Sequence, residues 1–216
     1  MKILKPEILQ QLQSVSSLAE LVACAKADDT DIAAKQFKGL VLTGADISKV
    51  CFKGCLFQSC KFIGCTFSQS DFINVIFSCC DISNCNFSES GFKQCAINNS
   101  KGVGASFQSS SLQHLHIAGS NFKYANFAKS KLANISLEDS DFSAAGMAEC
   151  KLANTVLNNC DFIGASFFKT PLKGVDFTEC RIDGIVICGE ELKGCVVTPL
   201  QAAELAKLLG VIIKQR

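Results

Sequence analysis

The sequence predicts an all-β solenoid, a chain wound into stacked coils, and three observations support this prediction. A five-residue period runs without a break in register from Phe37 to Val197. Sixteen of the 17 Phe residues fall on a single register of that period. Five residues match the period of neither an α-helix nor a straight strand, so the chain must bend at every repeat. A chain that bends regularly and keeps one face inward forms a solenoid.

Two registers of the repeat are expected to face the core. The first contains every residue from Phe37 to Val197 whose number ends in 2 or 7, and of these 33 positions only Gly102 lacks a large apolar side chain. The second, two residues earlier, contains small or compact residues, with Lys35 and Glu190 as its charged members. The other three positions are mostly Asp, Asn, Ser, Lys, Gln and Gly, as solvent-facing positions should be. The segment SKGVGAS around Gly102 predicts a local bulge.

The segment before the repeats, residues 1–36, predicts a helical cap. From Pro6 to Ala27 the apolar residues recur at three- and four-residue spacings, which predicts one or two amphipathic helices. Ser17 and Glu20 match a capping box for the second helical segment. We expect this segment to cover the open end of the first coil.

The segment after the repeats, residues 199–216, predicts a helix followed by a short strand. PLQAAELAKLLG begins with Pro199, which suits a first helical turn, and ends with Gly210 at a helix C-cap position. The apolar run Val211-Ile212-Ile213 then predicts the strand. Residues 37–198 between the two end segments form one uninterrupted repeat region.

Composition restricts the environment and the partners. Lys plus Arg total 21 and Asp plus Glu total 20, a balance that argues against direct nucleic-acid or anionic-membrane binding. No segment has the length of a membrane span or the apolar core of a signal peptide. Fourteen Cys without a secretion signal, in a chain large enough to bury a core, favour a reducing cytoplasm.

The repeat resembles the pentapeptide repeat family, whose motif is a small residue, Asp or Asn, Leu or Phe, and two variable residues. Examples are CNFSE from Cys85, SNFKY from Ser120, ANFAK from Ala125, SDFSA from Ser140 and CDFIG from Cys160. The resemblance implies a right-handed quadrilateral β-helix with four repeats per coil. Residues 20 apart should therefore stack, and residues 37–198 should form about eight coils.

Two segments are also similar to the Qnr-type quinolone-resistance proteins: SNFKYANFAKSKLANISLEDS, and GIVICGEELKGCVVTPLQAAELAKLLGVIIK at the C-terminal end. This resemblance implies a homodimer formed through the C-terminal helix and strand. The alternative is a monomer whose helix folds over the last coil. The implied dimer residues are Leu200, Leu205, Leu208, Leu209, Val211, Ile212 and Ile213.

The sequence contains no recognisable catalytic or metal-binding motif, so we expect neither an enzyme nor a cofactor or metal. His114 and His116 have no acid partner in sequence and are expected on the surface. Ten of the 14 Cys lie in the small inward register, where they act as apolar fillers. Cys51, Cys79 and Cys188 fall at outward positions.

Stacking at 20 residues separates the charges among the walls of the predicted solenoid. One wall gathers lysines, and two others gather acidic residues toward the C-terminal half. The Qnr-type resemblance implies a DNA-mimicking protein that binds DNA gyrase or topoisomerase IV and protects it from quinolones. The alternative is a protein-interaction scaffold with a different partner. The candidate partner-binding residues are Glu138, Asp139, Asp141, Asp161, Asp176, Glu179 and Asp183.

Overall fold

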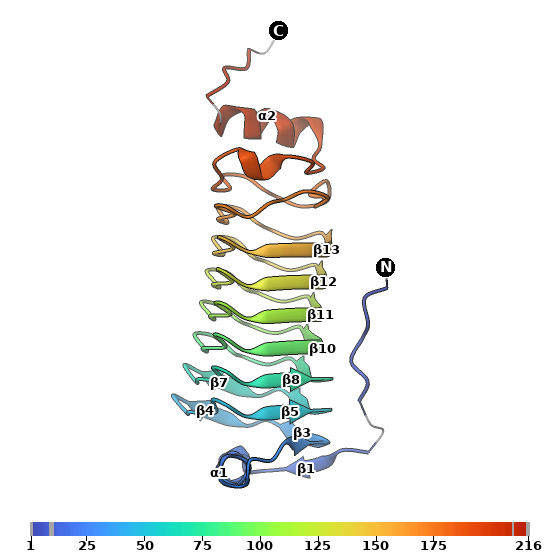
Figure 1. Ribbon diagram of the computed structural model, residues 1–216, viewed down its shortest axis with the longest axis vertical. Coiled ribbons are helices and arrows are strands. Elements are labelled where there is room, and N and C mark those ends of the chain that lie inside the picture. The colour runs from blue at the N-terminus through green and yellow to red at the C-terminus, as the bar shows by residue number, and fades with distance from the viewer. Residues whose placement is uncertain (1, 9–10, 209, 215–216) are drawn as a thin grey trace.

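The computed structural model describes residues 2–8, 11–208 and 210–214, which form a rod of stacked coils with a helix at each end (Figure 1). The helices are α1 (Leu18–Asp28) and α2 (Pro199–Leu208), with a short 3-10 helix at Glu190–Leu192. No helix within these ranges is long and apolar enough to cross a membrane. The strands are β1 (Gln13–Val15), β2 (Ile32–Ala33), β3 (Lys35–Lys38), β4 (Val41–Thr43), β5 (Cys51–Lys53), β6 (Leu56–Gln58), β7 (Lys61–Ile63), β8 (Asp71–Ile73), β9 (Ile76–Ser78), β10 (Gly91–Asn98), β11 (Ser111–Ala118), β12 (Lys131–Glu138) and β13 (Lys151–Asn158).

The pairing of the strands confirms the predicted solenoid. All pairs are parallel, and from Ile32↔Phe52 onward they join residues 20 apart. Isolated bridges keep the same register as far as Asp176↔Val196. Four five-residue repeats therefore complete one coil.

Each coil has four sides, which we call walls A to D in the order in which the chain forms them. Strands β10 to β13 run along walls A and B in turn, whereas walls C and D of the same coils carry isolated bridges joined by turns. Corners are named by the walls they join, so corner AB lies inside β10 to β13. The central inward residues are Phe52, Phe72, Phe92, Leu112, Leu132, Leu152, Leu172 and Leu192 on wall A; Phe37, Phe57, Phe77, Ile97, Ile117, Leu137, Leu157, Phe177 and Val197 on wall B; Leu42, Phe62, Ile82, Gly102, Phe122, Phe142, Phe162 and Ile182 on wall C; and Ile47, Phe67, Phe87, Phe107, Phe127, Met147, Phe167 and Ile187 on wall D.

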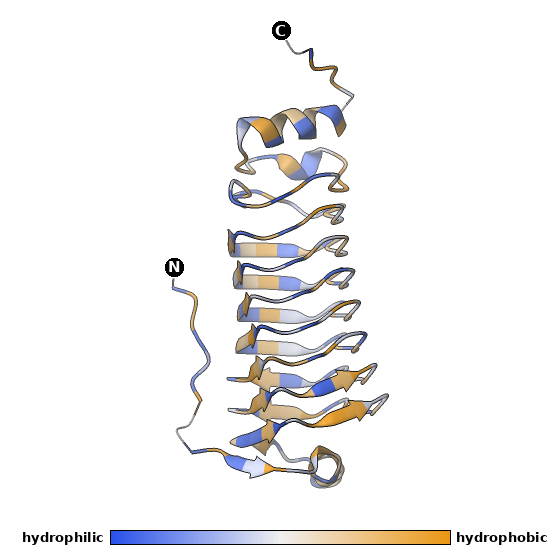
Figure 2. Ribbon diagram, turned by 180° about the vertical axis from the view of Figure 1, so that it is seen from behind, coloured by the Kyte–Doolittle hydropathy of each residue, from blue (hydrophilic) through white to orange (hydrophobic). Residues whose placement is uncertain are grey.

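The core consists of these stacked columns. The rings of Phe37 and Phe57 lie 4.8 Å apart and nearly parallel, and Phe87 stacks on Phe107 at 5.0 Å. Figure 2 shows hydrophobic and hydrophilic residues alternating along the strands, as expected when alternate side chains point inward. Burial of one such side chain contributes roughly 2 kcal/mol.

The polar residue before each large inward residue has a local structural role. The Oδ1 atom of Asp141 accepts a hydrogen bond from the backbone N–H of Ser143 at 2.9 Å, and Asn126 accepts one from Ala128 at 2.9 Å. The hydrogen bond joins the side-chain oxygen to the backbone N–H two residues later and so closes a turn. Asp and Asn favour turns of this kind. It explains why the repeat prefers these two residues at that position.

Gly102 leaves space for a ring of the next coil. A Cβ atom added there would lie 2.4 Å from Cε1 of Phe122. The predicted bulge is absent, because the bridges Asp81↔Lys101 and Lys101↔Asn121 keep the 20-residue register. The missing side chain is therefore compensated by the Phe122 ring.

The N-terminal segment differs from the prediction of helices from Pro6. Helix α1 begins only at Leu18, where the Ser17 Oγ accepts a hydrogen bond from the Glu20 N–H at 3.5 Å. Residues 2–8 are not helical and run beside the rod, and β1 pairs with β3 (Figure 1). Pairing with β3 gives the backbone N–H and C=O groups of β1 hydrogen-bond partners. A short isolated helix would leave more of these groups without partners. Strand pairing therefore starts before the predicted boundary at residue 37.

Helix α2 lies on the last coil. Thr198 and Gln201 form a capping box, with the Thr198 Oγ1 accepting from the Gln201 N–H at 3.2 Å and the Gln201 Oε1 accepting from the Thr198 N–H at 2.8 Å. The Gln201 Nε2 also donates to the carbonyls of Phe177 and Cys180 at 2.8 Å. These bonds fix the helix to the coil.

The end of α2 confirms one prediction and corrects another. Gly210 has a φ of 82° and donates its N–H to the carbonyl of Lys207 at 3.0 Å, as a C-cap glycine does. Residues 211–213 form no strand, so the predicted strand is wrong for the single chain. The described part of the chain offers this segment no neighbouring strand to pair with.

The ladder on walls A and B is interrupted between β13 and the next coil and resumes one coil later, where Leu172 pairs with Glu191 and Asp176 with Val196. Among the described residues, no backbone hydrogen bond joins β13 to residues 171–178, although walls C and D stay paired through Asp161↔Arg181. One cause is local: Pro171 has no N–H to donate to the coil below it.

The break opens the side of the rod at β13. Leu152 and Leu157 are only half-buried, whereas Leu132 and Leu137, one coil earlier, are 3% exposed. In the same coil the Thr155 Oγ1 is buried without a hydrogen-bond partner among the described residues.

Candidate functional site

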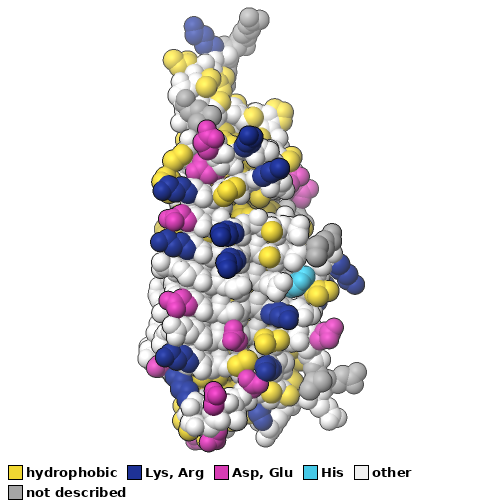
Figure 3. Space-filling model, viewed as in Figure 1, with side chains coloured by type: hydrophobic (Ala, Val, Ile, Leu, Met, Phe, Trp, Pro, Cys, Tyr) yellow, Lys and Arg dark blue, Asp and Glu magenta, His cyan; other side chains and the backbone are white. Residues whose placement is uncertain are grey.

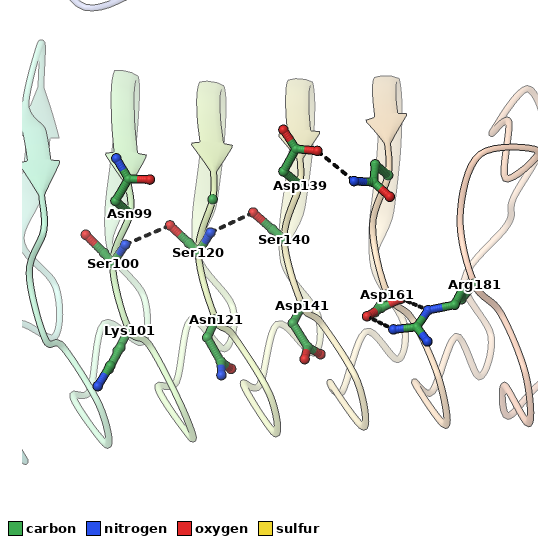
Figure 4. A pocket seen from close by; sticks show the side chains of 12 residues that line it. Asn99, Ser100, Lys101, Ser120, Asn121, Asp139, Ser140, Asp141, Asp161 and Arg181 are labelled. Carbon is green, nitrogen blue, oxygen red and sulfur yellow. Dashed lines mark hydrogen bonds and ion pairs between the residues drawn. The ribbon is translucent and has the colours of Figure 1, made fainter.

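Corner BC carries an open groove of about 560 Å³ that runs along the rod across successive coils (Figure 4). One side is formed by corner residues at the end of wall B and the other by the first residues of wall C. The groove brings together three of the predicted partner-binding residues, Asp139, Asp141 and Asp161. Its lining is Asn99, Ser100, Lys101, Gly119, Ser120, Asn121, Asp139, Ser140, Asp141, Asn159, Asp161 and Arg181.

A ladder of serines forms the floor of the groove. The backbone N–H of Ser100 donates to the Oγ of Ser120 at 3.0 Å, and that of Ser120 donates to the Oγ of Ser140 at 3.0 Å (Figure 4). These three serines are 2 to 5% exposed. Because each hydroxyl is engaged in the ladder, the floor is a rigid support and the recognition groups are those on its two sides.

Two of the acidic residues are paired with cations. Asp141 lies 3.2 Å from the Lys123 Nζ, and Asp161 binds Arg181 through both guanidinium donors Nε and Nη2. The Asp141 and Asp161 side chains are 26% and 23% exposed. Exposed pairs of this kind are individually weak, because water and salt screen them. A partner with a stronger cation can therefore compete for these carboxylates.

Two more acidic residues bond to neutral neighbours. The Asp139 Oδ1 accepts from the Asn159 Nδ2 at 2.8 Å. The Glu138 Oε1 accepts from the Ser136 hydroxyl at 2.7 Å and lies 3.9 Å from the His116 Nδ1. Both carboxylates keep their negative charge available to solvent.

The other three predicted residues lie in the next coil, outside the groove lining. Asp176, Glu179 and Asp183 are all exposed. Asp176 accepts from the N–H and hydroxyl of Thr178 at 2.9 and 2.7 Å. Glu179 and Asp183 make no hydrogen bond or ion pair with the described part of the chain. The seven residues thus share walls B and C, but only three line one groove.

Two carboxylates of this surface, Asp141 and Asp176, have a pKa below the ordinary value. Burial raises the pKa of Asp141, but hydrogen bonds from Ser143 and the charge of Lys123 outweigh burial and hold the pKa below its ordinary value. Hydrogen bonds from Thr178 likewise lower the pKa of Asp176. The surface is therefore negative at neutral pH.

Wall A, opposite wall C, has the reverse charge. Lysines of this wall recur through the coils, offset by Asp71 and Glu191, and Figure 3 shows Lys and Arg side chains along the face that carries β10 to β13. The acidic surface is thus confined to one side of the rod. The wall A lysines are Lys53, Lys93, Lys131, Lys151, Lys173 and Lys193.

The cysteines follow the predicted division between core and surface. Nine of them are buried, Cys51 is half-buried, and Cys79 and Cys188 are exposed. Burial raises the pKa of the Cys95 thiol to about 12, so this group is a filler and not a nucleophile. Within residues 2–8, 11–208 and 210–214, no three His, Cys, Asp or Glu side chains gather as a metal site.

Sequence reasoning missed the groups that pair with the acidic residues. Arg181 lies 20 residues after Asp161, so the coil repeat could have identified this pair. Lys123 lies 18 residues before Asp141, and its approach depends on how the long side chain crosses between coils. The floor serines were identified only as small core residues.

The predicted dimer residues separate into two groups. Leu200 and Ile212 are 82% and 86% exposed, and Leu208, Val211 and Ile213 are also exposed. Leu205 is only 6% exposed and packs against the last coil, so the single chain already covers most of it, and its place in an interface stays a prediction. Leu209 lies outside the described residues. A groove of about 480 Å³ between α2 and the last coil is lined in part by Leu200, Leu208 and Ile213.

Three family models match the repeat region. They are the pentapeptide repeat region over residues 70–143, pentapeptide repeats (9 copies) over 37–96, and pentapeptide repeats (8 copies) over 145–184. Together they cover almost all of residues 37–184. Comparison with curated protein sequences produced no match.

Solved structures of repeat proteins are also similar to the chain. HetL, a pentapeptide repeat protein involved in heterocyst differentiation regulation from the cyanobacterium Nostoc sp. strain PCC 7120, is 13% identical with a TM-score of 0.48, over 84% of this chain and 95% of that one. A trypsin-treated variant of QnrB1, a plasmid-mediated fluoroquinolone resistance protein, is 20% identical with a TM-score of 0.46, over 85% and 92%. A pentapeptide repeat protein from the Arabidopsis thaliana thylakoid lumen is 20% identical with a TM-score of 0.27, over 63% and 70%.

The family models and the observed coil agree residue by residue, since the matched ranges carry the five-residue period and the 20-residue pairing. The chain belongs to the pentapeptide repeat family.

Proposed function

We propose that this protein is a binding protein, not an enzyme, and that it contacts a partner protein through corner BC and the adjoining walls B and C. One observation carries the proposal: seven carboxylates from three successive coils gather on this side of the rod, while lysines occupy the opposite wall. A flat, rigid surface with one sign of charge favours a partner surface of the opposite sign.

The charge density of the surface supports a partner that normally binds duplex DNA. The seven carboxylates lie within three coils, about 14 Å of the rod at the ordinary strand spacing. Lys123 and Arg181 neutralise two of them, which leaves about one negative charge per 3 Å, compared with one per ~1.7 Å in DNA. The surface therefore approaches the charge density of DNA within a factor of about two, over a short length.

We further propose that the partner is a bacterial type II topoisomerase, DNA gyrase or topoisomerase IV. The sequence similarity of two segments to the Qnr-type proteins supports this choice, together with the acidic surface. The DNA-binding surface of the enzyme would then accept corner BC in place of DNA, and this protein itself would bind no nucleic acid.

The test is a supercoiling assay with purified DNA gyrase and ciprofloxacin into which the protein is titrated. We expect restored supercoiling, or inhibition of the enzyme at higher protein concentration. An absence of both effects with folded protein contradicts the topoisomerase proposal.

A matched pair of triple variants locates the contact. Asp139→Asn, Glu179→Gln and Asp183→Asn together remove three exposed charges from walls B and C, and we expect them to weaken binding to the enzyme at least tenfold. Asp71→Asn, Glu89→Gln and Glu149→Gln change the net charge equally on walls A and D, and we expect no loss. Equal loss in both variants would assign the effect to net charge alone.

A scaffold with a different basic partner is the second candidate. It is favoured by the short length of the acidic surface, since Lys101 and Lys123 replace acidic residues on wall C in the preceding coils. In that case the wild-type protein should capture a basic partner that the Asp139→Asn, Glu179→Gln, Asp183→Asn variant does not capture. Neither the wild-type protein nor the variant should then affect gyrase activity.

We also propose a homodimer formed through α2. The support is the exposed apolar group of Leu200, Leu208 and Ile212 beside the groove on the last coil, a set that monomers seldom leave uncovered. Light scattering during gel filtration should give twice the chain mass, and Leu200→Glu with Ile212→Glu should give the monomer mass. A monomeric wild-type protein would contradict this assembly.

A further inference from the structure

Residues 2–8 lie along corner AB, at the opposite edge of wall B from corner BC. Two backbone donors of this segment bind side chains of that corner. The Leu4 N–H donates to the His114 Nδ1 at 3.2 Å, and the Glu7 N–H donates to the Asn74 Oδ1 at 3.2 Å. Figures 1 and 2 both show the segment beside the coils. The corner therefore already holds an extended peptide.

The spacing of these two contacts follows from the repeat. Asn74 and His114 are two coils apart, about 9.6 Å at the ordinary strand spacing. The three residues from Glu7 to Leu4 span about 10 Å when extended and ~9.3 Å in a polyproline II conformation, which places every third residue on the same side. An extended chain can thus present a backbone donor to alternate corner residues.

Outward residues near corner AB are also shielded from solvent in several coils. Ala96, Asn134 and Ser136 occupy outward positions near corner AB, yet they are 4%, 7% and 5% exposed. The Val156 side chain, one coil beyond Ser136 on the same wall, is 52% exposed. The corner is therefore less exposed between Ala96 and Ser136 than it is at β13.

The chemistry of the segment is that of a peptide ligand. Ile3, Pro6 and Ile8 are half-buried, whereas the charged residues of the segment and Leu4 are exposed. Pro6 restricts the residue before it to extended conformations, which lowers the entropy lost on docking. The pattern is two apolar residues flanking a proline, with charges facing water.

We propose that corner AB is a binding surface for an extended peptide of a partner protein, one that carries apolar side chains around a proline. Residues 2–8 are an internal ligand of this surface and compete with the partner. Specific recognition comes from the side-chain acceptors of Asn74 and His114, and affinity comes from partial burial of apolar side chains such as Ile3, Pro6 and Ile8. The surface acts independently of corner BC.

Competition within one chain has a measurable consequence. A tethered segment has an effective concentration on the order of millimolar, so it excludes a weak peptide added from solution. Substituting Leu4→Pro and Glu7→Pro removes both backbone donors while keeping the segment extended. This variant should open the surface.

The experiment uses a fluorescein-labelled peptide with the sequence of residues 2–8 and measures its fluorescence anisotropy. We expect the Leu4→Pro, Glu7→Pro chain to bind the peptide at least tenfold more tightly than the wild-type chain. Adding His114→Gly and Asn74→Gly should abolish binding, whereas Asn84→Gly at corner CD should not. Glycine already occupies corner AB at Gly54 and Gly174, so these substitutions preserve the turn.

Hydrogen exchange of the wild-type chain supplies the second measurement. The amides of Leu4 and Glu7 should be protected, and His114→Gly with Asn74→Gly should remove the protection. Unprotected amides in the wild-type chain would overturn the proposal. So would a peptide affinity that is equal in the wild-type and Leu4→Pro, Glu7→Pro chains, or one that is unchanged by the two corner glycines, because the segment would then be only a structural element.

Discussion

Corners AB and BC are formed by the same coils and differ in what covers them. Corner AB has neutral side chains such as Asn74, Gln94 and His114 and is covered by the N-terminal segment. Corner BC has Asp139 and Glu179 and is open to solvent. Both rest on a column of buried side chains, and most corner residues of both, Asn74, His114 and Asp139 among them, adopt a left-handed conformation.

The difference shows where function is encoded in this fold. Backbone pairing and the inward residues are the same at both corners, so they cannot distinguish partners. The outward residues decide whether a corner holds a peptide through neutral acceptors or offers a row of charges. One rod can therefore present two surfaces of different chemistry.

The largest effect should come from the wall that the two corners share. Leu137 is the central inward residue of wall B and is 3% exposed, so Leu137→Ala should lower the free energy of unfolding by about 2–5 kcal/mol. Urea denaturation measures this loss, and exchange should increase at both corners. The exposed wall B residue Val156 is the control: Val156→Ala should change stability by less than about 0.5 kcal/mol. Faster exchange at only one corner would show that the corners do not share a cooperative unit.

The next effect concerns the open side of the rod at β13. Thr155 buries a hydroxyl with no partner among the described residues, and Val75 and Val175 occupy the same column. Thr155→Val should therefore raise the free energy of unfolding by about 1–2 kcal/mol. The equivalent change one repeat earlier, Cys150→Val, removes a thiol that hydrogen bonds the Phe127 carbonyl and should not stabilise. A loss of stability in Thr155→Val would mean that water satisfies the hydroxyl.

A pH-dependent effect is expected beside corner BC, at Asp141. Asp141 has a folded-state pKa below its unfolded value of about 3.9, so its stabilising contribution is full above that value and is lost as pH falls through the folded pKa. Asp141→Asn keeps the turn, as Asn121 and Asn126 do, but loses the charge. It should be less stable than wild type at pH 7 and nearly equal to it near pH 2 in urea denaturation. A constant difference across this range would exclude Lys123 pairing as the cause.

The smallest effect tests the conformation that all corners share. Ala144, at corner CD, has a φ of 55°, which costs an L-residue about 1–2 kcal/mol. Ala144→Gly removes this strain but adds unfolded-state entropy, so we expect a net stabilisation of about 0.5 kcal/mol in thermal denaturation. Gly164→Ala, at the same corner one coil later, should have the opposite sign.

The inward residues could be predicted almost one by one from the five-residue period, and the resemblance to the pentapeptide repeat family implied the 20-residue stacking that places Phe72, Phe92 and Leu112 in one column. The acidic side of the rod also followed from the 20-residue stacking. The pairing of Asp141 with Lys123 did not, since it depends on side-chain conformation across coils. Whether Glu179 and Asp183 contact a partner remains a prediction.

The two ends were predicted less well because they lack the repeat. The apolar spacing from Pro6 suggested helices, but pairing with the first coil and contact with corner AB are available only once the rod exists. Leu205 and Leu200 lie on the same short helix and have the same chemistry. Only the position of the last coil decides that the first is buried and the second exposed.

The sequence by itself determined the solenoid and its inward registers, because these depend on a local pattern repeated every five residues, and the family resemblance added the 20-residue stacking that defines the core columns and the walls. Tertiary structure decided which surfaces stay open. The path of residues 2–8 over Asn74 and His114, the break beyond β13 and the seat of α2 all depend on contacts between segments far apart in the chain, and no local pattern encodes which of these contacts forms.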